Sequence, residues 1–121
     1  MLHPNIKHLL ITITFLFVTF LSGYSQYSTE INKLLKDVKE ASFADSATLF
    51  KIGQHAILKT AKTKDRGAEA DVNIYYGNYF YYTRNIDRAK YYFEKAKLKA
   101  QAFSNKHIET LAIIRLIFID Y

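Results

Sequence analysis

The sequence predicts an all-α fold, and three observations point to it. Half of the 121 residues are hydrophobic, which is enough apolar material for one small domain. Turn-forming residues are scarce, with one proline and four glycines, whereas β proteins need frequent Gly, Pro and Asn-Gly turns. Apolar side chains after residue 28 recur at helical spacing. We therefore expect helices joined by short polar turns.

Residues 1–25 are expected to form a signal-peptide helix. Lys7 and His8 give a weakly basic start, residues 9–21 are an apolar run, and small residues precede a cleavage site before Gln26. An uncleaved membrane anchor is the alternative. The apolar run would extend about 20 Å as a helix, which is short of a hydrocarbon core of ~30 Å. Since cysteine is absent, a lipoprotein signal is excluded.

The first two helices are predicted over residues 29–43 and from 46 to about Lys62. Apolar residues of the first helix follow the i, i+3, i+4, i+7 pattern of an amphipathic helix: Ile31, Leu34, Leu35 and Val38. Asp45 is suited to cap the second helix, which ends before a polar turn with a glycine. Together, residues 26–67 are interpreted as a degenerate first helical repeat.

Three further helices are predicted along the rest of the chain. The third covers residues 68–83 and is dense in tyrosine, and Arg84-Asn85 separates it from a fourth over 86–102. We interpret residues 68–105 as a second helical repeat. Residues 106–121 then form the first helix of a truncated next repeat, which suggests the N-terminal piece of a longer array.

A repeat supports this division. When the chain is shifted by 40 residues against itself, several identities share that offset: Ala56 with Ala96, Leu58 with Leu98, Lys59 with Lys99 and Glu69 with Glu109. A common offset in which turns coincide with turns is typical of stacked helix pairs.

Within the second repeat, residues 70–103 resemble a tetratricopeptide repeat, a 34-residue helix-turn-helix. Small and aromatic residues stand at the positions that the family uses for packing: Gly77, Phe80, Ala89, Phe93 and Ala96. Asn73 stands where the family has Trp, and Gln101 replaces its closing Pro. The resemblance implies an α-solenoid of antiparallel helix hairpins in which those five residues pack the repeats.

No catalytic constellation is recognised, so we expect neither an enzyme nor a cofactor. Metal-thiolate and thiol chemistry need cysteine, which is absent. Four histidines are solitary, without partners at metal-ligand spacing, and no phosphate-binding glycine loop occurs. The net charge of +6 is scattered, which favours a solvated surface over a nucleic-acid patch.

The resemblance also implies a concave groove, formed by the first helices of successive pairs, that binds a protein or peptide. Mapped onto this chain, the candidate groove residues are Asp71, Ile74, Asn78, Tyr81, Tyr82, Leu111, Ile114 and Phe118. Tyrosine suits recognition because it offers a large, rigid contact with a hydroxyl group. Packing against further repeats of the same chain is the alternative role for these side chains, and for Leu111 and Ile114 it is favoured.

The predicted function is a protein-protein interaction scaffold on the exported side of a bacterial membrane. We expect it to be the N-terminal sensory part of a larger membrane-anchored regulator with a histidine-kinase or DNA-binding output. The alternative is a free-standing periplasmic or secreted repeat protein that binds a peptide or glycan. Nucleic acid is not expected as a partner, and the membrane is expected only through an uncleaved signal segment.

Overall fold

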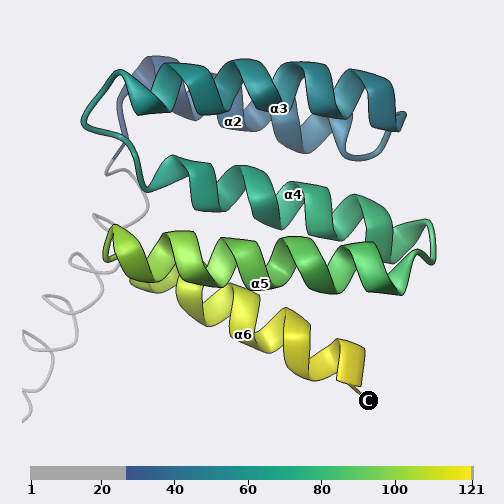
Figure 1. The fold of residues 1–121 in the computed structure, drawn as a ribbon. Coiled ribbons are helices and arrows are strands. Elements are labelled where there is room, and N and C mark those ends of the chain that lie inside the picture. Colours follow the sequence, from purple (N-terminus) through teal and green to yellow (C-terminus); the bar gives the residue numbers. More distant parts are fainter. Residues whose placement is uncertain (1–26, 121) are drawn as a thin grey trace, which may run out of the picture.

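The computed structural model describes residues 27–120, and this part of the chain is helical throughout, with no strand (Figure 1). The helices are α2 (Thr29–Ala41), α3 (Ser46–Ala61), α4 (Ala68–Tyr82), α5 (Ile86–Ala102) and α6 (Lys106–Asp120). The all-α prediction is therefore confirmed. The expected signal peptide, residues 1–25, lies outside the described residues. Among the described helices, none combines the length and apolar character needed to cross a membrane.

Side-chain caps explain where most of these helices begin. The Ser28 hydroxyl accepts a hydrogen bond from the Ile31 amide at the start of α2. Asp45 does the same for Thr48 in α3, at 2.8 Å. Asn85 and Asn105 cap α5 and α6 in the same way. Each cap satisfies one of the amides that the first helical turn leaves without a partner.

The connections on either side of α5 share one backbone design. Arg84 and Ser104 adopt left-handed conformations, with φ of 63° and 56°. After each of them, the amide of the capping asparagine bonds back to the preceding helix: Asn85 to the Phe80 carbonyl and Asn105 to the Ala100 carbonyl, both at 2.8 Å. This is the hydrogen bond of a Schellman motif. It lets a three-residue turn reverse the chain and start the next helix.

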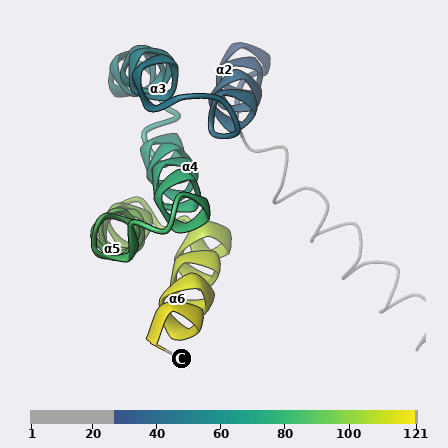
Figure 2. The ribbon, with the colours of Figure 1, turned by 90° about the vertical axis from the view of Figure 1, so that its right-hand side faces the viewer.

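The helices form a stack of hairpins. α3 packs on α2 and α5 packs on α4, while α6 packs against α5 and α4. An end-on view shows α3 and α5 on one side, α2 and α6 on the other, and α4 between them (Figure 2). α4 also contacts both helices of the first hairpin. The helices α2, α4 and α6 therefore contact one another in series and share one face of the molecule.

α4 carries residues of both apolar clusters of the described chain. Its Val72 and Tyr76 pack with α2 and α3, whereas its Ile74 and Phe80 pack with α5 and α6. The five residues expected to pack the repeats, Gly77, Phe80, Ala89, Phe93 and Ala96, are all buried. Their burial brings α4 and α5 into close contact.

An aromatic cluster joins the two hairpins. Phe50 of α3 lies with its ring centroid 4.6 Å from that of Tyr76 on α4, and Tyr76 lies 5.2 Å from Tyr92 on α5. The Tyr92 ring also stacks on Phe80 at 5.6 Å. Aromatic pairs at these spacings stabilise packing beyond the area that they bury. The first hairpin is thus tied to the second through large rings as well as aliphatic contacts.

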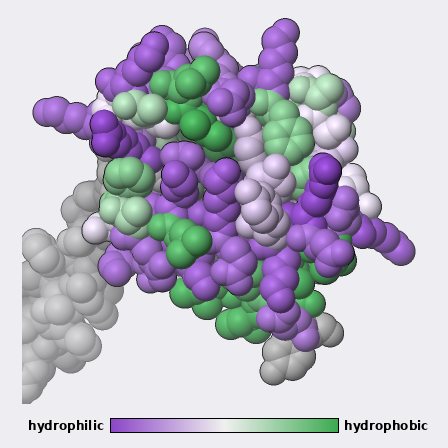
Figure 3. Space-filling model, viewed as in Figure 1, coloured by the Kyte–Doolittle hydropathy of each residue, from purple (hydrophilic) through white to green (hydrophobic). Residues whose placement is uncertain are grey.

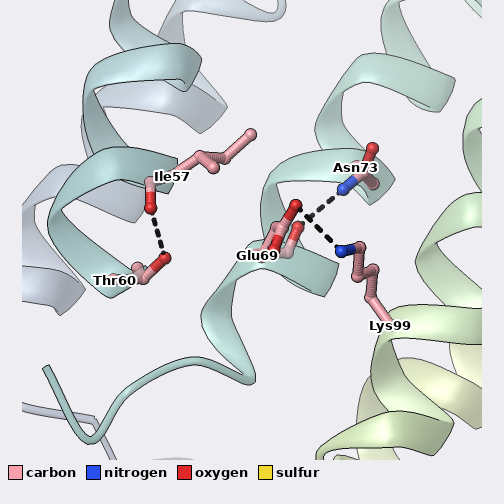
Figure 4. A network of polar contacts seen from close by, with 5 residues as sticks. All are labelled: Ile57, Thr60, Glu69, Asn73 and Lys99. Atoms are coloured by element: carbon pink, nitrogen blue, oxygen red, sulfur yellow. Dashed lines mark hydrogen bonds and ion pairs between the residues drawn. The ribbon is translucent and has the colours of Figure 1, made fainter. Parts of the chain in front are cut away.

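Polar contacts between α4 and α5 lie beside a buried amide (Figure 4). Lys99 pairs with the Glu69 carboxylate at 3.5 Å, and Asn73 donates its side-chain N–H to the Glu69 carbonyl at 2.9 Å. Asn73 is almost fully buried, yet its Oδ1 forms no hydrogen bond. A buried acceptor without a partner destabilises the fold. At this position the family that the sequence resembles carries Trp.

Candidate functional site

A groove of about 470 Å³ lies on the face shared by α2, α4 and α6. We call it the A-face groove. Its lining comes from all three helices and from the caps that precede α2 and α6: Tyr27, Asn32, Leu35, Lys36, Lys39, Asp71, Ile74, Tyr75, Asn105, His107, Ile108 and Leu111. This volume lies within the range of pockets that hold small ligands or parts of a peptide.

Three residues of the groove lining, Tyr27, Asp71 and Asn105, form a hydrogen-bonded cluster near the N-terminal ends of α2, α4 and α6, which we call the knot. The Tyr27 hydroxyl donates to Oδ2 of Asp71 at 2.8 Å, and the Asn105 amide donates to the Tyr27 oxygen at 2.6 Å. The same amide contacts Asp71 Oδ2 at 3.4 Å and the Gly67 carbonyl at 3.2 Å. Because Asn105 also caps α6, one side chain joins the starts of α2, α4 and α6. The knot fixes the spacing of the three helices at this end.

Burial dominates the electrostatics of the knot. It raises the pKa of Asp71 from its ordinary value of 3.8 to about 6, although hydrogen bonds from Tyr27 and Asn105 act in the opposite direction. Burial also raises the pKa of the neighbouring Tyr75 phenol, and the charge of Asp71 adds to that shift. A buried carboxylate of this kind favours its neutral form more than a surface carboxylate does.

The remaining lining separates into an apolar part and a basic part. Leu35, Ile74 and Ile108 are buried, and Leu111 is half-buried. Lys36 and Lys39 on α2 are exposed, as is His107 on α6. The groove therefore offers aliphatic surface beside positive charge, with a carboxylate at one end. That combination can bind an apolar side chain flanked by acidic groups.

Three of the eight residues expected in a groove line this one: Asp71, Ile74 and Leu111. Ile74 is 2% exposed, so most of its surface packs in the core. Asn78 lies half-buried farther along α4 and does not line the groove.

The other four predicted residues lie on two different surfaces. Tyr81 and Tyr82, at the end of α4, are exposed and lie close together, with ring centroids 6.1 Å apart. Ile114 and Phe118 are exposed on α6, where further large apolar side chains are also exposed: Ile113 and Ile117. Hydrophobic residues are visible at the lower edge of the molecule, where α6 lies, whereas hydrophilic residues dominate over α5 and are mixed with hydrophobic patches over α3 (Figure 3). The eight candidates therefore do not form one site.

Sequence reasoning missed the contribution of α2. When α2 and α4 are aligned at their first residues, Thr29 and Ala68, the groove residues Asn32, Leu35 and Lys36 fall opposite Asp71, Ile74 and Tyr75. This correspondence is a signal in the sequence, but the first helix lacks the small and aromatic residues on which the resemblance depends. Asn105, which is not among the predicted site residues, also lines the groove.

Within residues 27–120, no three His, Cys, Asp or Glu side chains are grouped so as to hold a metal ion. His55 and His107 lie on separate elements, α3 and α6. Comparison of the chain with protein-family models, with curated proteins and with solved structures finds no match.

Proposed function

We propose that this chain is a protein-interaction scaffold of tetratricopeptide type that holds a segment of a partner in the A-face groove. The observation that carries the proposal is the groove itself, which is lined by the first helix of each successive pair. Small buried residues at the contact of α4 and α5, Gly77 and Ala89 among them, support the tetratricopeptide assignment.

The lining suggests which segment the groove prefers. Leu111 is half-buried and offers aliphatic surface that favours a branched apolar side chain, and Lys36 and Lys39 favour acidic residues beside it. We infer a partner segment with an aliphatic residue flanked by Asp or Glu.

A displayed random-peptide library tests this proposal. Selection on the full chain should enrich peptides with an aliphatic residue next to acidic ones. Replacing Lys36 and Lys39 by Glu should weaken their binding about tenfold, since two favourable charge contacts become repulsive. Lys33→Glu with Lys62→Glu is the matched control, because these exposed lysines make the same charge change outside the groove.

Two outcomes would count against the groove. One is the absence of any enriched motif. The other is a set of enriched peptides that binds the Lys36/Lys39 variant as well as it binds the control variant.

Export and the place of the scaffold in a larger regulator are further parts of the proposal. The apolar run of residues 9–21 supports export. A reporter that is active only outside the cytoplasm, fused after residue 120, tests it directly. For the regulator, the gene's reading frame after residue 121 is informative: a membrane span with a kinase or DNA-binding domain would support it, and a stop codon would favour a free-standing binder.

A further inference from the structure

We propose that a second site, at the hairpin turns, binds a proline-rich segment of a partner in the polyproline II conformation. The site is a cleft of about 300 Å³ between the turn that follows α2 and the end of α4. We call it the turn cleft, and its lining is Ser42, Phe43, Ala44, Tyr79, Tyr82 and Thr83. It shares no residue with the A-face groove, so it goes beyond the function proposed above.

Two rings of the turn cleft are exposed and in contact with each other. Phe43 is 69% exposed and Tyr82 is 57% exposed, yet the two rings stack on each other with centroids 5.9 Å apart and planes at 25°. Tyr81 continues the aromatic surface, with its ring 6.1 Å from that of Tyr82. These rings come from two different hairpins. A contiguous exposed apolar patch of this kind marks an interaction surface more often than scattered apolar residues do.

The polar groups of the turn cleft are few and mostly engaged. The Ser42 hydroxyl donates to the Lys39 carbonyl, and the Thr83 hydroxyl donates to the Tyr79 carbonyl at 3.0 Å. No lining residue carries a charge at neutral pH. The phenol groups are therefore the donors that remain for a ligand.

This chemistry distinguishes among ligand classes. A charged ligand finds no counter-charge among the lining residues, and a sugar ring finds few side-chain groups to pair with its hydroxyl groups. A prolyl residue has no N–H to satisfy and presents an apolar ring, and its segment needs only a donor for an occasional carbonyl group. Proline-rich segments dock in aromatic-lined grooves for this reason.

The size of the turn cleft supports the same ligand. Its volume is at the lower end of the range for ligand pockets. Polyproline II has three residues per turn and needs no partner strand. One or two prolyl rings would contact Phe43 and Tyr82, and the following residues would reach Tyr81.

Fluorescence anisotropy of labelled decaproline, titrated with the full chain, tests the proposal. We expect saturable binding that Phe43→Ala and Tyr82→Ala each weaken about tenfold. Phe43 is largely exposed, so its replacement should leave the fold intact, as far-ultraviolet circular dichroism can verify. Tyr82→Phe keeps the ring and should cause a smaller loss. Tyr91→Ala is the matched control, because this exposed tyrosine on α5 lies outside the cleft.

Three results would overturn the proposal. The first is a signal from decaproline no larger than that of a labelled Gly-Ser decamer. The second is binding of decaproline that Phe43→Ala leaves unchanged. The third is displacement of decaproline by chitohexaose, which would identify the turn cleft as a glycan site. Peptides selected by the A-face groove should not compete with decaproline, so failure at one site is distinguishable from failure at the other.

Discussion

The ring of Phe93 occupies the space that a side chain at residue 77 would need. A Cβ atom placed on Gly77 would lie 2.5 Å from both Cδ1 and Cε1 of that ring. Phe93 is fully buried, so the ring cannot turn away into solvent. α4 and α5 approach as closely as they do because residue 77 has no side chain, and the position of α6 against both helices depends on that approach.

Gly77→Ala should therefore destabilise the protein. Helix propensity alone would make the alanine variant more stable by about 1 kcal/mol. A loss of stability would therefore come from the packing around the added methyl group. We expect a net loss of about 1–3 kcal/mol in the free energy of unfolding, measured by urea denaturation.

Gly67→Ala is the matched control for that substitution. A Cβ at Gly67 would meet its neighbours only at 3.6 Å or beyond, and the residue has an ordinary φ of −61°. It should change stability by less than about 0.5 kcal/mol. Adding Phe93→Leu to Gly77→Ala should recover part of the loss. If Gly77→Ala were as stable as the parent chain, the close contact of α4 and α5 described above would be wrong.

The turns on either side of α5 offer stabilising substitutions. Arg84 and Ser104 hold left-handed conformations that glycine adopts without steric cost. We expect Arg84→Gly and Ser104→Gly each to stabilise by about 0.5–1 kcal/mol, seen as a higher urea midpoint with an unchanged slope. Thr83→Gly is the control, because Thr83 has a φ of −86° and should lose stability. A loss in all three variants would contradict the turn geometry.

Replacing Asn73 tests the cost of a buried acceptor. Leucine has nearly the same shape and removes the unpaired Oδ1, while the Glu69 carbonyl keeps its place in the helix. Asn73→Leu should stabilise by about 1 kcal/mol, measured by thermal and urea denaturation. Destabilisation would mean that Oδ1 has a partner such as an ordered water molecule.

The knot predicts how stability depends on pH. The pKa of Asp71 is about 6 in the folded state, above its ordinary value of 3.8, so the folded state binds this proton more tightly than the unfolded state does. The contribution of Asp71 to the free energy of unfolding is therefore greatest below pH 4, and it falls as the pH rises to about 6. Asp71→Asn should be close to neutral at pH 4 and stabilising by on the order of 2–3 kcal/mol at pH 7.5.

Urea denaturation of Asp71→Asn and the parent chain across pH 4–8 measures that difference. Asp87→Asn, in the exposed first turn of α5, is the control and should not reproduce the rise. Three groups interact with Asp71: Tyr27, Asn105 and Tyr75. The groove lining also contains three basic side chains: Lys36, Lys39 and His107. A difference between the two proteins that did not vary with pH would refute the raised pKa.

The fold was largely predictable because its signals are local. Apolar periodicity and capping residues such as Asp45 located all five described helices within about two residues of their ends. The first helix was expected to reach residue 43 and ends at Ala41, because the Ser42 amide and hydroxyl bond back to the last carbonyl groups of α2. The third was expected to reach residue 83 and ends at Tyr82.

The candidate site was less predictable because it depends on how helices face one another. Tyr81 and Tyr82 are predicted as groove residues, but they lie in the last turn of α4, where Tyr82 stacks on Phe43 and Tyr81 contacts Tyr82. The role of Phe43 depends on a contact between two hairpins, which no periodicity within one helix reveals. Tyr27 lies before α2, and its bond to Asn105 joins residues far apart in the chain.

The central claim is that the face shared by α2, α4 and α6 holds the partner. Amide chemical-shift mapping on the isotope-labelled chain, titrated with a peptide selected from the library, tests it most directly. The account predicts that the largest shifts fall on Lys36, Tyr75 and Leu111. Shifts confined to the outer surfaces of α3 and α5, with that face unchanged, would contradict it.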